Sequence, residues 1–243
     1  MVIDIGNTCL KTFYFSPSGT LCKNNVYSST DDFIRSDLSS YPSINAAIIC
    51  SVTNDTLTLQ DFLSEKTKTL VFQPDMPLPI INNYGTKQTL GSDRLAAAIG
   101  ANSLFPNQNT LVIDAGTCIK YNFINSKAEF LGGAIAPGLS MRLKALHHFT
   151  DRLPLISTFP KNDLKLIGKT TEESILLGVY EAALFEMKGF IAEYKMTFNE
   201  LNIILTGGDA SFFETHLKNS IFADPYLIAK GLNTLLNYNL SLK

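Results

Sequence analysis

The stretch Val2-Ile3-Asp4-Ile5-Gly6, at the start of the chain, returns in the second half as Val112-Ile113-Asp114-Ala115-Gly116. In each copy an apolar run leads into a carboxylate and a glycine, which is typical of a buried strand that turns sharply at its end. Such a turn can present a carboxylate, a hydroxyl and backbone N–H groups to a phosphate–metal complex. An ordinary hairpin turn would look the same locally, because Gly-Asn pairs are common turn residues. The second copy therefore favours the functional interpretation.

The repeat extends beyond the two carboxylates. Gly6-Asn7-Thr8-Cys9-Leu10-Lys11 is matched, with one residue dropped, by Gly116-Thr117-Cys118-Ile119-Lys120. A later apolar run, Ile48-Ile49-Cys50-Ser51, has a counterpart in Ile203-Ile204-Leu205-Thr206. Internal repetition on this scale predicts two domains of similar fold. The predicted domains are residues 1–107 and 108–243.

The first half of the chain alternates between strand-like and helix-like segments. β-Favouring and apolar runs predict strands, and capped amphipathic runs predict helices. The expected order is strands over 12–15 and 20–28, a helix over 30–38, a strand over 46–50, a helix over 56–66 and a strand over 70–72. This order implies an α/β fold with a partly parallel sheet covered by helices. In the second half we expect helices over 139–149, 171–194 and 224–236, the last of which could return onto the first domain.

Composition excludes several classes of protein. The 243 residues are 45% hydrophobic and 17% charged, which is enough for a sizeable core. The net charge of −2 gives no broad attraction for nucleic acid, and no apolar run approaches the roughly 18 residues needed to cross a bilayer. The start of the chain has no basic segment followed by an apolar one, so we expect no signal peptide and a cytoplasmic protein.

Cysteines and histidines indicate neither disulfides nor a zinc site. The four cysteines form no CxxC pair and are expected to be reduced thiols, whereas the three histidines show no HExxH spacing. These residues are Cys9, Cys22, Cys50, Cys118, His147, His148 and His216. We expect His147 and His148 to be solvated or hydrogen-bonded residues of a helix, since a catalytic role has no further support.

A second candidate site begins at Leu90-Gly91-Ser92-Asp93-Arg94, just before the alanine-rich run 95–98. Alanine favours a helix, and Ser92 is a plausible N-cap that would place Asp93 in the first turn. Two interpretations are open at this point. Asp93 and Arg94 are either a helix-start residue and a solvated side chain, or a carboxylate and a guanidinium at the mouth of a cleft.

Glycines punctuate the second half of the chain. Thr206-Gly207-Gly208-Asp209 follows an apolar strand, where the glycines allow either close approach of a ligand or a tight strand-to-helix turn. The run 167–171 resembles the tail of a Walker A loop, but the required first glycine falls on Asp163, which excludes a P-loop. Thr170 and Glu173 instead have the spacing of a capping box for the long helix.

Five of these motifs occur in the order seen in type III pantothenate kinases, and the resemblance covers nearly the whole chain. The motifs are Asp4-Ile5-Gly6-Asn7-Thr8, Leu90-Gly91-Ser92-Asp93-Arg94, Asp114-Ala115-Gly116-Thr117, the glycine-rich run 132–138 and Thr206-Gly207-Gly208-Asp209. The resemblance implies the fold of the acetate and sugar kinase, actin and heat-shock chaperone superfamily. That fold consists of two ribonuclease H-like domains with a nucleotide cleft between them.

The resemblance also implies an activity and an assembly. The activity is ATP-dependent phosphorylation of pantothenate to 4′-phosphopantothenate, the first step of coenzyme A biosynthesis. The assembly is a homodimer in which the partner chain completes the pantothenate pocket, with the helices that start at Leu139 and Thr171 as candidate interface elements. The alternatives are another small-molecule kinase or phosphatase of the same superfamily and a non-enzymatic, nucleotide-dependent regulator.

Residue roles follow from the resemblance position by position. Asp93 is similar to the general base, Asp4 to a residue that organises Mg²⁺ through water, and Asp114 to the ligand of a monovalent cation, K⁺ or NH₄⁺. The implied ATP-binding residues are Asp4, Ile5, Gly6, Asn7, Thr8, Cys9, Leu10, Lys11, Thr117, Gly207 and Gly208. The implied pantothenate-binding residues are Tyr84, Gly91, Ser92, Asp93, Arg94 and Thr171. After Thr117 the family commonly has a small residue and, further on, an acidic one, whereas this chain has Cys118 and then Lys120, Tyr121 and Asn122.

Overall fold

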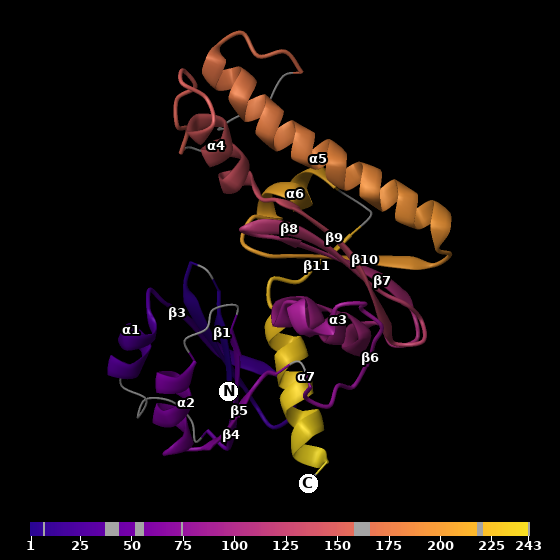
Figure 1. Cartoon of the computed structure of the whole chain (residues 1–243). Helices are drawn as coiled ribbons and strands as arrows, with labels where there is room; N and C mark the ends of the chain where they lie inside the picture. The colour runs from indigo at the N-terminus through magenta and orange to yellow at the C-terminus, as the bar shows by residue number, and fades with distance from the viewer. Residues whose placement is uncertain are drawn as a thin grey trace. The chain divides into compact units, whose positions relative to one another are not determined.

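The computed structural model describes residues 1–6, 8–36, 44–51, 56–73, 75–157, 166–217 and 221–242 (Figure 1). The chain forms two compact units. Unit 1 consists of Met1–Asn107, Ile124–Gly132 and Tyr226–Lys243, and unit 2 of Gln108–Phe123 and Gly133–Pro225. The domain boundary after residue 107 stays a prediction. In the structure, the unit that begins at Met1 also holds the stretch around residue 128 and the last helix.

The sheet of unit 1 has five strands in the order β3-β2-β1-β4-β5. Their bounds are β1 Val2–Ile5, β2 Leu10–Phe15, β3 Leu21–Tyr27, β4 Ala46–Ser51 and β5 Lys68–Val71. β1 pairs antiparallel with β2 and parallel with β4, and β4 pairs parallel with β5. Val2 and Ile3 are fully buried, as expected of a central strand covered on both faces. The predicted strand and helix order of the first half is confirmed.

The sheet of unit 2 repeats this arrangement. Its strands are β7 Asn109–Ala115, β8 Cys118–Ile124, β9 Glu129–Pro137, β10 Leu201–Thr206 and β11 Phe222–Ala223. They lie in the order β11-β10-β7-β8-β9. Read from the other edge, this order matches that of the first sheet, with β7 in the place of β1 and β10 in the place of β4. β7 pairs parallel with β10, as β1 does with β4. The predicted duplication of an α/β unit is therefore confirmed. The β8–β9 connection belongs to unit 1, where β6 Ile81–Asn82 pairs with β9 at Glu129 and Phe130.

Helices cover both sheets, and their ends differ slightly from those predicted. In unit 1 they are α1 Thr30–Arg35, α2 Leu57–Ser64, the short 3-10 helix η2 Lys87–Thr89, α3 Ser92–Leu104 and α7 Leu227–Ser241. In unit 2 they are α4 Leu139–His148, α5 Thr171–Thr197 and α6 Ala210–His216. The predicted end of the first helix at Leu38 lies outside the described residues. No helix within the described ranges combines the length and apolar character that a membrane span requires.

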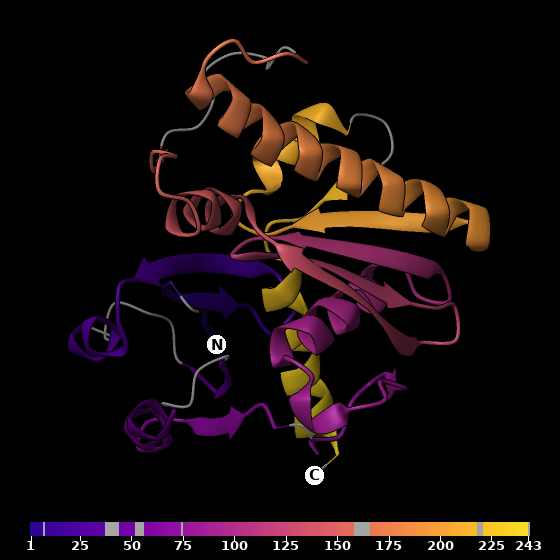
Figure 2. The ribbon, with the colours of Figure 1, turned by 45° about the horizontal axis from the view of Figure 1, so that its top comes forward.

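One side of α5 forms the centre of the unit 2 core. Its buried residues recur at helical spacing and pack in one cluster with apolar side chains of β7, β8 and β10. They include Ile175, Val179, Ala183, Met187 and Ile191. Figures 1 and 2 both show α5 lying along this sheet. Since Ile113 and Ala115 point into this core, the intervening Asp114 faces the opposite side of the sheet.

α3 and α7 approach each other closely at two glycines. A Cβ on Gly231 would lie 1.9 Å from the Ala96 carbonyl oxygen, and a Cβ on Gly100 would lie 2.5 Å from the Leu227 carbonyl oxygen. Neither position has room for a side chain, so the backbones of the two helices come into direct contact. This packing holds the end of the chain against α3, the helix that begins at the second candidate site.

We expect Gly231→Ala to lower the free energy of unfolding by about 1–3 kcal/mol, because the added methyl group overlaps the α3 backbone. Gly189→Ala is the matched control. Gly189 lies in α5 with open space around its Cβ position, so alanine should be neutral or raise stability by up to about 1 kcal/mol. Chemical denaturation followed by circular dichroism measures both, and equal effects would contradict the proposed contact.

Candidate functional site

The first glycine-rich turn joins β1 to β2. The N–H of Gly6 donates a hydrogen bond to the Cys9 carbonyl at 3.1 Å, which closes the turn, and Thr8 on this turn is exposed. Asp4 is the cross-strand partner of Lys11 and is only partly buried. Because cross-strand partners project from the same face of the sheet, the strand end presents a carboxylate and an ammonium group from neighbouring positions.

The corresponding turn in unit 2 joins β7 to β8 and is one residue shorter. The N–H of Gly116 donates to the Cys118 carbonyl at 3.1 Å, whereas the equivalent bond in unit 1 spans one residue more, from Gly6 to Cys9. The one-residue deletion in the second copy of the sequence repeat therefore falls inside the turn. Thr117 is exposed at its tip, as Thr8 is in the first copy. The two turns are therefore structural equivalents, each with an exposed hydroxyl next to a strand-end carboxylate.

Among the other residues predicted at the ATP site, Ile5 and Leu10 are buried strand residues and Cys9 is half-buried. The side chains of Ile5 and Leu10 are therefore turned into the protein and leave their backbone groups for contact with a phosphate, whereas Cys9 lies in the turn itself. Asn7, the residue between Gly6 and Thr8, lies outside the described residues.

Asp114 differs from Asp4 in its surroundings. Asp114 is only 6% exposed, and its Oδ2 lies 2.7 Å from the Nζ of Lys120. The two side chains come from the neighbouring strands β7 and β8. Alternation along β8 sends Ile119 and Tyr121 into the α5 core and Lys120 to the opposite face, the face that Asp114 also occupies. A lysine thus neutralises the strand-end carboxylate of unit 2.

Glycines from two other segments pack against the β7–β8 turn. A Cβ on Gly138 would lie 2.2 Å from the Gly116 carbonyl oxygen, and a Cβ on Gly207 would lie 2.2 Å from the Ala115 carbonyl oxygen. Gly207 also has φ +101°, a conformation that strongly favours glycine. Among the described residues, apart from Gly208 and its two neighbours in the chain, no atom lies within 4 Å of a Cβ built on Gly208. Gly207 is therefore required by the turn, whereas Gly208 offers exposed backbone to a ligand.

Hydrogen bonds complete the packing around this turn. The N–H of Gly138 donates to the Thr117 carbonyl at 3.1 Å, and the N–H of Asp209 donates to the Ala115 carbonyl at 2.9 Å. Burial raises the pKa of the Asp209 carboxyl. The turn thus has its shape fixed by contacts with two segments that are distant in sequence.

A polar network fixes the end of β9, where the glycine-rich run 132–138 finishes. Arg142 of α4 donates through Nε to the Pro137 carbonyl at 2.8 Å, and its guanidinium forms an ion pair with Glu186 of α5 at 2.7 Å. The Tyr121 hydroxyl donates to the other Glu186 oxygen at 3.3 Å. Burial and then the charge of Glu186 raise the pKa of Tyr121. This network connects the β7–β8 hairpin, α4 and α5.

The second candidate site lies at the start of α3 in unit 1. Gly91, not Ser92, is the N-cap, and this corrects the predicted cap. The reason is tertiary: the Ser92 hydroxyl donates to the Ser51 carbonyl at 3.2 Å and accepts from Cys50 at 3.3 Å, so it ties α3 to β4. Asp93 is nonetheless in the first turn, as predicted. Its Oδ1 accepts the backbone N–H of Arg94 at 2.8 Å, which orients the carboxylate.

Arg94 is 4% exposed, so the interpretation of a solvated side chain is wrong. Its guanidinium carbon lies 5.3 Å from the centre of the Tyr84 ring and 5.7 Å from that of Phe130, within the range of cation–π attraction. Its Nη1 is 3.5 Å from the Tyr84 hydroxyl. Gly132 makes room for this ring, because it has φ +104° and a Cβ there would lie 3.1 Å from Tyr84. The structure thus brings Tyr84 and Arg94 together, with Asp93 directly before Arg94 in the first turn of α3.

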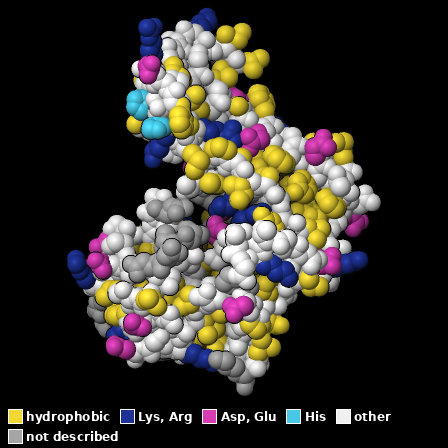
Figure 3. All heavy atoms as spheres, viewed as in Figure 1, with side chains coloured by type: hydrophobic (Ala, Val, Ile, Leu, Met, Phe, Trp, Pro, Cys, Tyr) yellow, Lys and Arg dark blue, Asp and Glu magenta, His cyan; other side chains and the backbone are white. Residues whose placement is uncertain are grey.

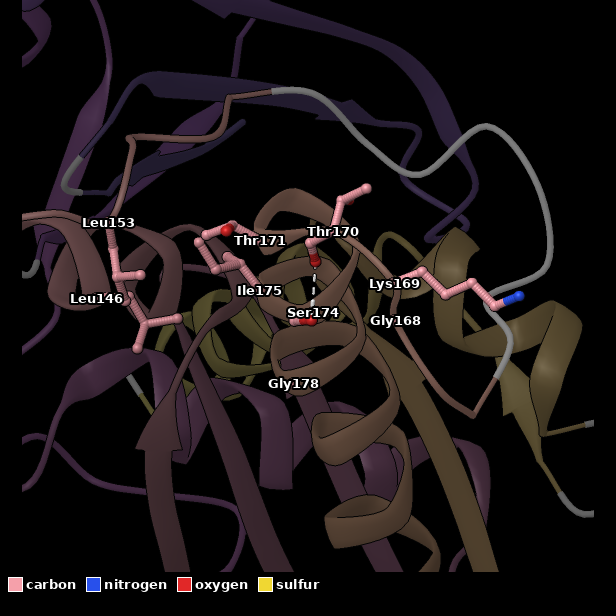
Figure 4. A pocket seen from close by; sticks show the side chains of 9 residues that line it. All are labelled: Leu146, Leu153, Gly168, Lys169, Thr170, Thr171, Ser174, Ile175 and Gly178. Atoms are coloured by element: carbon pink, nitrogen blue, oxygen red, sulfur yellow. Dashed lines mark hydrogen bonds between the residues drawn. The ribbon is translucent and has the colours of Figure 1, made fainter.

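Thr171 lies in unit 2 at the start of α5, where it lines a pocket of about 670 Å³ (Figure 4). Thr170 is the N-cap and accepts the N–H of Glu173 at 3.1 Å, while Glu173 accepts the N–H of Lys169 at 2.6 Å. The Thr170 half of the predicted capping box is therefore confirmed, whereas the Glu173 side chain bonds to the residue before the cap instead of to the cap itself. The pocket has hydroxyl groups on α5 and apolar side chains of Leu146 and Leu153. Sequence reasoning missed these leucines, and nothing in their spacing indicates that they share a pocket with α5.

The described residues contain no group of three or more His, Cys, Asp or Glu side chains that could hold a metal ion by themselves. His147 and His148 are exposed at the end of α4, and Figure 3 shows histidine side chains on the surface there. The Nδ1 of His147 lies 2.8 Å from the Leu153 carbonyl oxygen.

Two solved structures with a similar fold cover almost the whole chain. A conserved Baf family protein from Campylobacter jejuni matches with a TM-score of 0.67 and 20% identity, covering 99% of this chain and 98% of that one. The activator of the 2-hydroxyisocaproyl-CoA dehydratase from Clostridium difficile, solved with bound ADPNP, matches with a TM-score of 0.54 and 13% identity, covering 99% and 97%. With the repeated strand order, these likenesses confirm two ribonuclease H-like units.

Sequence comparison identifies the family. The family model described as type III pantothenate kinase matches residues 1–193. The type III pantothenate kinase of Cytophaga hutchinsonii is 44% identical over 241 residues, which cover 98% of this chain and 99% of that one. Those of Christiangramia forsetii and Bacteroides fragilis are each 42% identical and cover 98% of both chains. The chain therefore belongs to the type III pantothenate kinase family.

Proposed function

We propose that this protein transfers the γ-phosphoryl group of ATP to the primary hydroxyl of pantothenate and so makes 4′-phosphopantothenate, the first intermediate on the way to coenzyme A. The observation that carries the proposal is the start of α3 in a chain of this family, where the backbone orients the carboxylate of Asp93 and the guanidinium of the next residue, Arg94, is buried against Tyr84. Phosphoryl transfer depends mainly on positioning and charge stabilisation, and this arrangement supplies both.

Asp93 acts as the general base. Its Oδ1 is held by the N–H of Arg94, and the side chain is only partly buried, so a hydroxyl group can approach the carboxylate. As the oxygen of pantothenate attacks phosphorus, Asp93 accepts its proton. Gly91 leaves the necessary space, because a Cβ there would lie 2.6 Å from Asp93 Oδ1.

Pantothenate carries a carboxylate at one end and the reacting hydroxyl at the other. We assign its recognition to the buried charge of Arg94, to Tyr84, to the backbone of Gly91 and Ser92 and to the hydroxyl of Thr171. The Thr171 pocket suits such an amphipathic molecule, since Thr171 and the apolar side chains of Leu146 and Leu153 line it together (Figure 4).

ATP is bound by the two glycine-rich turns, whose backbone N–H groups and exposed Thr8 and Thr117 hydroxyls contact phosphate oxygens. Lys11 contributes a positive charge near the first turn, and Gly207 together with the exposed backbone of Gly208 borders the adenosine. A Mg²⁺ ion fits Asp4, because Mg²⁺ keeps several waters and needs only one or two carboxylates when it also binds substrate phosphates. When bound, the ion neutralises charge on the phosphates.

The proposed active form is a homodimer assembled through α4 and α5. Large apolar side chains are exposed on both helices and at the end of α4: Met141 (40%) on α4, Phe149 (80%) at its C-cap and Phe185 (53%) on α5. Exposed apolar side chains of this size are typical of protein interfaces.

The direct test of the function is an assay of purified protein with ATP, Mg²⁺ and a panel of alcohol acceptors, with products identified by mass spectrometry. Pantothenate should be the preferred acceptor and 4′-phosphopantothenate the product. Preference for a sugar or a small acid would favour another kinase of the superfamily, and ATP binding without transfer to any acceptor would favour a regulator.

Asp93→Asn should lower kcat by about 10²–10⁴-fold, because the amide cannot accept the hydroxyl proton. The fold and the affinity for ATP should remain, as measured by circular dichroism and calorimetry. Asp31→Asn makes the same change in the first turn of α1, far along the chain from any predicted site residue, and should leave kcat unchanged. A rate near wild type in Asp93→Asn would rule out its role as base.

Thr171→Val should raise the Michaelis constant for pantothenate about fivefold, the equivalent of one lost hydrogen bond of about 1 kcal/mol, without changing stability. Thr170→Val should instead lower the free energy of unfolding by about 1 kcal/mol, because it removes the N-cap of α5. Steady-state kinetics and denaturation of both variants separate the roles. An unchanged Michaelis constant in Thr171→Val would exclude its contact with pantothenate.

Phe149→Asp should shift the protein from dimer to monomer in analytical ultracentrifugation, because a carboxylate cannot be buried without a partner in an apolar interface. Leu57→Asp alters another exposed residue, at the first position of α2, and should leave the dimer intact. A monomeric wild-type protein, or equal effects of the two substitutions, would contradict the proposed interface.

A further inference from the structure

The ion pair between Asp114 and Lys120 stands at the position where the family resemblance implies a bound monovalent cation. Lys120 Nζ lies 2.7 Å from Asp114 Oδ2, with side-chain exposures of 19% for the lysine and 8% for the aspartate. The two strands direct both side chains to the sheet face opposite the α5 core. The carboxylate predicted to bind K⁺ or NH₄⁺ therefore already has a cationic partner from its own chain.

A lysine ammonium has the properties that a monovalent cation would bring to this carboxylate. It carries one positive charge, and its three N–H donors can be directed to several oxygen atoms. An additional cation at the Asp114 carboxylate would lie within a few ångströms of this charge, where like charges repel. The residues present do not fit a K⁺ ion at Asp114 in the way that the resemblance implies.

The chain also departs from the family pattern, which commonly has an acidic residue some way after the second turn, where this chain has Lys120, Tyr121 and Asn122. None of these three side chains is acidic, so this stretch supplies no second carboxylate as an oxygen ligand for a cation. Lys120 instead brings a positive charge to Asp114, so the departure and the ion pair point to the same conclusion.

We propose that the ammonium group of Lys120 replaces the monovalent cation at Asp114, so that this kinase turns over without K⁺ or NH₄⁺. The inference rests on the proposed function and concerns its cation requirement. Lys120 acts as a positioning residue: it neutralises Asp114 and places a fixed positive charge at the base of the turn that carries Thr117. The shape of the turn does not depend on it, since Gly116, Gly138 and Asp209 hold the backbone by hydrogen bonds.

The test measures initial rates with ATP, Mg²⁺ and pantothenate in a buffer with choline as the monovalent cation, and again with K⁺ at the same ionic strength. Wild-type protein should show the same rate in both. Lys120→Met keeps a long apolar stem but removes the charge, so its rate in choline should fall at least about tenfold. Addition of K⁺ or NH₄⁺ should restore much of that rate. Lys68→Met, which alters a lysine in a strand of the other sheet, is the control. Its rate in choline should equal that of the wild type, and added K⁺ should not change it.

A second measurement does not require turnover. In the presence of Mg²⁺ and a non-hydrolysable ATP analogue, K⁺ should raise the melting temperature of Lys120→Met above its value in choline, because the vacated position can then bind the ion. The wild-type melting temperature should be the same in both buffers. Direct binding of thallium, observed by ²⁰⁵Tl resonance, should likewise appear only in the variant.

The outcomes separate the two proposals. A wild-type rate that depends strongly on K⁺ would overturn the role of Lys120 and leave the kinase function standing. A Lys120→Met protein that K⁺ neither activates nor stabilises would also overturn it. Absence of phosphopantothenate with every cation would overturn the proposed function, and the melting and thallium experiments would still decide whether Lys120 occupies a cation site.

Discussion

The turn between β7 and β8 has no room for side chains on the segments that pack against it, and much of unit 2 is arranged around this constraint. Gly138 and Gly207 come from the end of β9 and the end of β10, and each places its backbone directly against carbonyl groups of residues 115–117. A methyl group at either position would overlap the turn. The glycine-rich motifs of the second half are therefore explained first by packing, and they leave Thr117 and Gly208 exposed for a ligand.

In unit 1 the corresponding constraint is the placement of two charged side chains at the start of α3. The backbone N–H of Arg94 holds the Asp93 carboxylate, and the Arg94 side chain is buried against Tyr84 and Phe130 instead of extending into solvent. Burial of a guanidinium is costly unless aromatic rings and polar groups surround it. A guanidinium that is buried despite this cost is typical of a site that binds an anion. The burial of Arg94 therefore agrees with a substrate that carries a carboxylate.

Much of this arrangement could be predicted from the sequence, because the repeat itself implies two similar sheets. The common strand order and the parallel pairing of β1 with β4 and of β7 with β10 follow that expectation. Features that depend on contacts between distant residues could not be predicted. The Ser92 hydroxyl bonds to β4, so it is not the cap that local rules favour, and the burial of Arg94 depends on rings that lie 10 and 36 residues away in the chain. The Asp114–Lys120 pair could have been anticipated, since alternation places both side chains on one sheet face.

The central claim is that both strand-end turns contact the phosphates of one ATP while Asp93 accepts the proton of the pantothenate hydroxyl. A crystal structure with Mg²⁺, a non-hydrolysable ATP analogue and pantothenate tests it most directly. The account predicts phosphate oxygens within hydrogen-bond distance of backbone N–H groups in the turns that follow Asp4 and Asp114, and the pantothenate hydroxyl within that distance of Asp93. Phosphates bound to only one turn, or a pantothenate hydroxyl remote from Asp93, would contradict it.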